Sequence, residues 1–186
     1  MRRAAAIALA ILCLAATPAR ALDIISGSPL YDPVLAGDLS KVERVLVSGG
    51  AVPDARLDET GKTALMLAAA AGNEDMVALL LKYKAKPDYR DEVGNTALAY
   101  AAYGGHRESV EALLHGGAAP DPENRQGMTP LMLAAQQGKA DVVRILIGKG
   151  ADLTKLDFTG RTALMWAESN RRAAVVSLLK QAGAKQ

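Results

Sequence analysis

A step of 33 residues recurs along this chain and constrains its fold more than any other feature. Four threonines follow this step, and a glycine stands two positions before each of them. The threonines are Thr63, Thr96, Thr129 and Thr162, and the glycines are Gly61, Gly94, Gly127 and Gly160. A fixed period of this length is typical of stacked arrays, in which each unit buries its apolar face against its neighbours. The sequence therefore predicts a stack of copies of one small unit.

Each copy carries the signals of two short helices. The repeated threonine can cap the first helix, and Pro130 stands at the first helical position, where its missing N–H has no partner to lose. Gly72, Gly105 and Gly138 follow their threonines by nine residues and can end that helix in the left-handed conformation. A second helix is predicted from apolar pairs one turn apart. These pairs are Met76, Val77, Leu80 and Leu81 in one copy, and Val142, Val143, Leu146 and Ile147 in another.

The repeated unit resembles the ankyrin repeat. That family is marked by a threonine-proline-leucine start, an alanine pair, a glycine, and a second helix of valine and leucine that closes on glycine-alanine. Thr129-Pro130-Leu131 and Gly150-Ala151 carry these marks here. The resemblance implies an all-α ankyrin-repeat solenoid of helix-turn-helix units with short β-hairpin-like loops, and about five repeats including degenerate caps.

The repeat boundaries follow from the same alignment of the chain with itself. We expect residues 22–186 to form the ankyrin-repeat domain. Full repeats are predicted at 60–92, 93–125 and 126–158, a degenerate N-terminal repeat at 25–59, and a C-terminal repeat at 159–186.

The two end repeats depart from the pattern. Asp32-Pro33 replaces part of the alanine run in the first repeat, so its first helix is expected to be shortened or to start again with Asp32 as cap. In the last repeat, Arg171 and Arg172 belong to a charged segment that replaces alanine and glycine, and we expect them to be solvated. Atypical ends fit an array whose outer faces meet water.

Residues 1–21 have the pattern of a secretory signal peptide. Arg2 and Arg3 precede an apolar run over residues 4–16, and Ala19-Arg20-Ala21 fits a signal-peptidase site. The run is shorter than the ~20 residues of a membrane-spanning helix, so no membrane insertion is expected after signal removal.

Removal of this segment changes the charge and the thiol content. It leaves 165 of the 186 residues and takes three of the 22 basic residues but none of the 20 acidic ones, so the formal charge falls from +2 to −1. A nearly neutral chain gives no reason to expect a nucleic acid as partner. The only cysteine, Cys13, is lost as well, so no disulfide is expected.

Methionine recurs at one position of the repeat, as Met66, Met132 and Met165, and in an exported protein this suggests copper. Equivalent residues of stacked repeats lie about 10 Å apart, too far for two of them to share an ion, and Ala99 interrupts the series. We therefore expect the methionines to fill gaps between helices, with no metal or cofactor bound. Trp166 is also interpreted as core.

No motif for catalysis is present. His106 and His115 have neither a cysteine nor an acidic partner at ligand spacing, and the chain has no nucleophile elbow, phosphate loop or zinc-hydrolase motif. Acidic pairs such as Glu74-Asp75 fit helix starts and solvated surface. His106 resembles the family's structural histidine, which bonds the backbone of a neighbouring loop. We expect no enzymatic activity.

The resemblance implies a concave binding face made by the loop tips and the exposed side of the first helices. The only phenylalanine, Phe158, and Tyr103 are candidate aromatic anchors. The alternative is that Phe158 folds over the last repeat and Tyr103 packs beside Tyr100. The full predicted set of partner-binding residues is Glu59, Lys62, Glu92, Asn95, Tyr103, Arg125, Met128, Gln136, Gln137, Phe158 and Arg161.

These features together favour a non-catalytic interaction module, or adaptor, that acts in the cell envelope as a monomer. It would bind a partner protein through the concave face, in the periplasm or, as the alternative location, after secretion. Two other functions stay open: a copper-binding or redox-protective envelope protein, and a factor secreted into a host. Acidic early tips and basic late tips suggest a partner of opposite polarity along its length.

Overall fold

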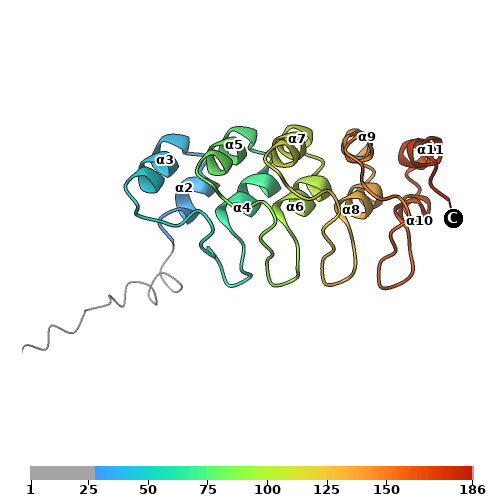
Figure 1. Ribbon diagram of the computed structural model, residues 1–186, viewed down its shortest axis with the longest axis horizontal. Helices are drawn as coiled ribbons and strands as arrows, with labels where there is room; N and C mark the ends of the chain where they lie inside the picture. The colour runs from blue at the N-terminus through green and yellow to red at the C-terminus, as the bar shows by residue number, and fades with distance from the viewer. Residues whose placement is uncertain (1–27, 186) are drawn as a thin grey trace, which may run out of the picture.

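The computed structural model describes residues 28–185, and all regular secondary structure in this part of the chain is helical. The predicted signal peptide and Cys13 lie outside the described residues. Two parallel rows of helices run along one axis (Figure 1). The first row holds α2 (Tyr31–Leu35), α4 (Ala64–Ala71), α6 (Ala97–Gly104), α8 (Pro130–Gln137) and α10 (Ala163–Ser169). The second row holds α3 (Leu39–Val47), α5 (Glu74–Lys82), α7 (Arg107–His115), α9 (Ala140–Gly148) and α11 (Ala173–Gln181).

The internal helices of the first row, α4, α6 and α8, begin and end where the sequence predicts. The threonine hydroxyls at Thr63, Thr96, Thr129 and Thr162 accept hydrogen bonds from the backbone three residues later, at 3.2–3.4 Å. Gly72 ends α4 with φ of +70°, a left-handed conformation in which an L side chain is strained. Hairpin-like loops then project from this row, away from the second row (Figure 1).

The core lies between the two rows and contains one leucine from each row in each repeat. Leu65, Leu98, Leu131 and Leu164 of the first row are at most 1% exposed, and Leu80, Leu113, Leu146 and Leu179 of the second row are fully buried. Met66 and Met132 are each 1% exposed, which fits the predicted packing role. No helix within residues 28–185 is long and apolar enough to cross a membrane.

The first repeat confirms one expectation and corrects another. Helix α2 is shortened to five residues, but the predicted cap at Asp32 is wrong, because the helix begins one residue earlier and Leu30 at its N-cap makes no side-chain bond. Pro33 is the third helical residue, where its missing N–H has no intrahelical acceptor in any case. The proline is therefore tolerated without a new helix start.

The last repeat corrects the expectation that Arg172 is only a solvated charge. Its Nε donates a hydrogen bond of 3.0 Å to the carbonyl oxygen of Gln136, in the preceding repeat. Arg171 takes φ of +56° at the position that is glycine in the internal repeats. Helix α10 ends one residue earlier than its counterparts, so this segment differs in length as well as in charge.

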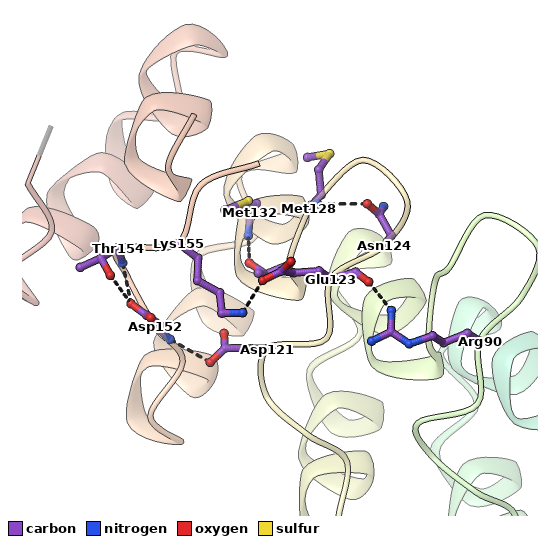
Figure 2. Close-up of polar contacts among 10 residues, drawn as sticks. Arg90, Asp121, Glu123, Asn124, Met128, Met132, Asp152, Thr154 and Lys155 are labelled. Carbon is purple, nitrogen blue, oxygen red and sulfur yellow. Dashed lines mark hydrogen bonds and ion pairs between the residues drawn. The ribbon is translucent and has the colours of Figure 1, made fainter. Parts of the chain in front are cut away.

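Aspartates on the segments that connect the repeats join each unit to the next. Backbone N–H groups of Lys86, Ala119 and Asp152 donate to the carboxylates of Asp54, Asp88 and Asp121, at 2.8–3.0 Å. Figure 2 shows the last of these bonds. In the same view, Lys155 contacts the side-chain carboxylate of Glu123, and Arg90 donates to the backbone carbonyl of Glu123 from the opposite side. Neighbouring repeats are thus held at a fixed spacing on this side of the stack.

Candidate functional site

The loop tips project from the first row of helices, and local hydrogen bonds order them. An aspartate or asparagine opens each tip and closes it by accepting backbone N–H groups: Asp58, Asp91, Asn124 and Asp157, at the 33-residue step. Figure 2 shows one of these bonds, from the Met128 N–H to Asn124, at 3.0 Å. Successive tips also pair through their backbones, since the Phe158 N–H donates to Gln126 and the Arg125 N–H to Val93, both at 3.0 Å. The tips therefore present their side chains from fixed positions.

A groove of about 660 Å³ opens between the last tips and the first-row helices α6, α8 and α10. Ala99, Met128 and Leu133 are less than 10% exposed and form its base. Tyr103 and Phe158 are 51% and 75% exposed and form its rim. The volume lies within the range of about 300–1,000 Å³ that is usual for ligand pockets.

Differences between the repeats explain why the hollow lies here. Ala99 occupies the position that is methionine in three other copies, so the base lacks one long side chain. Leu133 occupies the position that is Tyr100 in the preceding copy and Trp166 in the following one. Two large aromatic side chains thus flank a smaller one, which leaves space between them; we name this hollow, with its rim, the aromatic groove.

Each aromatic wall is fixed by a hydrogen bond to its own loop tip. The Tyr100 hydroxyl donates to Asp91 at 2.6 Å, and the Trp166 indole N–H donates to Asp157 at 2.8 Å. In the full repeats at 60–92 and 126–158 the equivalent residues, Leu67 and Leu133, have no polar group to donate. Trp166 is partly buried: it packs against the apolar core, as interpreted from the sequence, and it also lines the groove.

The hydrogen bonds also change the proton affinity of these groups. Burial alone would raise the pKa of Asp157, but the bonds from Thr159, Arg161 and Trp166 together outweigh it and hold that pKa below its ordinary value. Burial, and next the bond to Asp91, raise the pKa of Tyr100, so this hydroxyl stays protonated. Asp157 is therefore an anion that its own neighbours already satisfy.

The predicted binding residues divide into two groups. Asn95, Tyr103, Arg125, Met128, Gln136 and Phe158 line the aromatic groove, whereas Glu59 and Glu92 line a second hollow near the first repeat. Lys62, Gln137 and Arg161 line neither. Lys62 lies over the Tyr100 ring at 5.3 Å, and Arg161 over the Trp166 ring at 4.8 Å.

Met128, Tyr103 and Phe158 differ in how far they are exposed. Met128 is only 6% exposed, so it is a packed residue of the base and its expected exposure at the tip is wrong. Tyr103 is exposed and does not pack away beside Tyr100. The Phe158 ring lies against Gly127 of the preceding tip, where an added Cβ would come within 2.7 Å of it, and it stays largely open to solvent.

Sequence reasoning missed Tyr100, Leu133, Trp166 and the vacancy at Ala99 as parts of the site. A signal for them exists in the repeat itself, because these are positions where the copies differ in side-chain volume while the surrounding leucines stay the same. His106 contacts the backbone of the preceding repeat, as expected, but its Nε2 lies 3.0 Å from the carbonyl oxygen of Ala70 in helix α4 and not from a loop residue.

Histidine, aspartate and glutamate side chains, which could bind a metal ion, occur throughout the described residues. Among them no three histidine, cysteine, aspartate or glutamate side chains are grouped as a metal ion would need. Met66 and Met132 point into the apolar core, which leaves their sulfur atoms out of contact with solvent.

Comparison with known families gives one match. Residues 31–124 and 110–186 match the family described as ankyrin repeats (3 copies), and the two segments together span most of the chain. No curated protein matches the sequence.

Proposed function

The chain belongs to the ankyrin-repeat family, whose repeats are generic protein–protein interaction modules, and on this premise we propose that it binds a partner protein through the aromatic groove. The family is typically non-catalytic. The function that this geometry supports best is that of an adaptor.

The exposed rim is the observation that carries the proposal. Phe158 is the most exposed large apolar side chain of the described residues, at 75%, Tyr103 is 51% exposed, and both stand on the rim of the same hollow. Aromatic side chains are enriched among the residues that dominate the binding energy of protein interfaces. A partner that covers the groove would bury both rings at once.

The experiment is capture of partners from an envelope extract with wild type and a double variant, Tyr103→Ala with Phe158→Ala. A matched control is Val47→Ala with Leu156→Ala, which removes two apolar side chains that are 67% and 54% exposed outside the groove. We expect recovery of the partner to fall at least about tenfold in the groove variant and to stay at the wild-type level in the control. Equal recovery by all three proteins would overturn the proposal.

The cell envelope is the proposed location, on the basis of residues 1–21. The charged start, apolar run and small-residue site in that segment support export and cleavage after Ala21. Fractionation of the native cell tests the compartment and separates the periplasm from secretion, including secretion into a host. An intact mass that corresponds to a chain beginning at Leu22 is the expected result, and a full-length mass would contradict it.

Copper binding is retained only as an alternative to test. The burial of Met66 and Met132 favours packing, because a buried thioether must leave its core contacts to reach an ion. Copper(I) titration followed by mass analysis should show no stoichiometric binding. Binding that is lost in Met66→Leu with Met132→Leu would instead support the metal-binding function.

A further inference from the structure

The aromatic groove has an apolar base and an unpaired positive charge at its edge. Ala99, Leu133 and Met128 offer no hydrogen-bonding side chain, so the base suits an apolar group. Arg125 lines the groove, and Arg161 lies over one of its walls, the Trp166 ring. Neither guanidinium forms an ion pair with a carboxylate of the described residues, and both are exposed.

Amide side chains complete the lining. Asn95, Gln126 and Gln136 lie around the groove, and each carries both donors and an acceptor. The backbone of an extended peptide also presents donors and acceptors along its length, so these amides can pair with it regardless of its side chains. The groove therefore combines a hollow for one side chain with polar groups for the chain that carries it.

We infer that the aromatic groove binds an extended segment of the partner that inserts one bulky aliphatic or aromatic side chain over Ala99 and Leu133, with acidic residues beside it that face Arg125 and Arg161. This inference rests on the proposed function and adds the chemistry of the recognised segment. A bulky side chain fits the hollow, and its acidic neighbours complement the two unpaired cations.

A cationic ligand is the competing occupant, since aromatic walls attract cations. Two features of the groove oppose it. The Trp166 and Tyr100 rings are already in contact with cations of this chain, Arg161 and Lys62. Asp157, the acidic residue of the lining, is only 5% exposed and is satisfied by its own neighbours. Arg125 adds like-charge repulsion, which favours the acidic segment.

The sole tryptophan of the chain provides a direct reporter, because Trp166 lines the groove. Four short capped peptides are titrated against the exported protein: a leucine between glutamates, an alanine between glutamates, a leucine between lysines, and a leucine between glutamines. We expect the leucine-glutamate peptide to change the Trp166 emission and to bind about 10- to 100-fold tighter than the alanine-glutamate peptide. Its affinity should fall as salt rises, whereas that of the leucine-glutamine peptide should not.

Two kinds of variant test the base and the edge separately. Ala99→Met restores the residue that the other repeats carry and fills the base, so binding should weaken at least about tenfold without a change in the rim. Arg125→Gln and Arg161→Gln should each weaken the leucine-glutamate peptide about two- to fivefold and leave the leucine-glutamine peptide unchanged. Lys149→Gln, an exposed lysine outside the groove, is the matched control. Circular dichroism checks the fold of each variant.

The peptide titrations test this inference, and the partner capture tests the proposed function, so a failure of one can be told from a failure of the other. Equal or tighter binding of the lysine-flanked peptide, or no emission change with the leucine-glutamate peptide at millimolar concentration, overturns the inference. This comparison uses wild type, so it holds even where Ala99→Met does not fold. Partner capture that depends on Tyr103 and Phe158 then still supports the proposed function. Capture that is insensitive to both rings overturns the proposed function itself, whatever the peptides do.

Discussion

Ser109 provides a sharp test of the packing between repeats. Its side chain is fully buried in α7, and no hydrogen-bond partner lies near its hydroxyl in the described residues. The equivalent residues of three other repeats are Met76, Val142 and Val175, all fully buried and apolar. One polar atom thus interrupts an apolar stack, and an unsatisfied buried hydroxyl costs about 1–3 kcal/mol.

Ser109→Val should therefore stabilise the protein. The change removes the unsatisfied hydroxyl and adds a buried methyl group worth about 0.8 kcal/mol, so we expect the free energy of unfolding to rise by about 2–3 kcal/mol. Ser109→Ala removes the hydroxyl without adding volume, and a gain of about 1–2 kcal/mol is expected. For an array of this size the valine variant should melt roughly 4–12 °C higher than wild type.

Urea unfolding followed by far-UV circular dichroism measures both free energies, provided that the m-value stays constant. Ser177→Ala in α11 is the control, because that serine is exposed, and its change reports the difference in helix propensity, about 0.5 kcal/mol, together with the loss of one exposed hydrogen bond from Gln181. Loss of stability in Ser109→Ala would refute the reasoning, since it would mean that the hydroxyl is hydrogen-bonded. A loss in the valine variant alone would show that the site lacks room for the second methyl group.

Three further predictions concern single positions of the repeat. Lys84→Gly and Arg171→Gly should each raise the free energy of unfolding by about 0.5–1 kcal/mol in the same assay. These residues have φ of +66° and +56°, and the equivalent positions of other repeats are glycine. An equal loss of unfolding free energy in both variants would contradict the strain argument. His106→Ala should lower the free energy of unfolding by about 1–2 kcal/mol, because it removes the contact with the Ala70 carbonyl and the packing on Gly72. His115→Ala, at an exposed position, should change the free energy of unfolding little. The carboxyl groups of Asp58 and Asp157 have a lowered pKa in the folded protein. The stability that they add is complete above their unfolded pKa of about 3.9 and is lost as pH falls through the lower folded values. The free energy of unfolding, measured from pH 5 downward, should therefore decrease mainly below about pH 4, and less steeply in Asp157→Asn.

The sequence predicts the scaffold well because the scaffold depends on residues that repeat. Thr129 and Gly138 show this, since a cap and a left-handed stop act within a few bonds of their own positions. The leucines of the core repeat at the same step and are buried as expected. Local signals that recur in every copy therefore give the helices, their ends and their stacking.

The groove was harder to predict because it depends on contacts between copies. Trp166 follows a buried-looking methionine, and only the position of Asp157 shows that its indole turns toward the loop tip. Arg172 looks like a solvated charge until the Gln136 carbonyl of the preceding repeat lies within its reach. Met128 stands at a tip in the alignment, yet the fold of the hairpin turns it inward. Trp166 thus depends on a partner outside α10, Arg172 on a partner in the preceding repeat, and Met128 on the turn of its hairpin.

The bonds that backbone N–H groups donate from one tip or connecting segment to another all have the same direction. Backbone donors at Glu92, Arg125 and Phe158 in the tips, and at Lys86, Ala119 and Asp152 on the connecting segments, each lie 31 or 32 residues after their acceptors. A ribosome makes the acceptor of every such pair first. Each unit that leaves the exit tunnel therefore meets acceptors already present on the unit before it, so the stack can lengthen in step with translation.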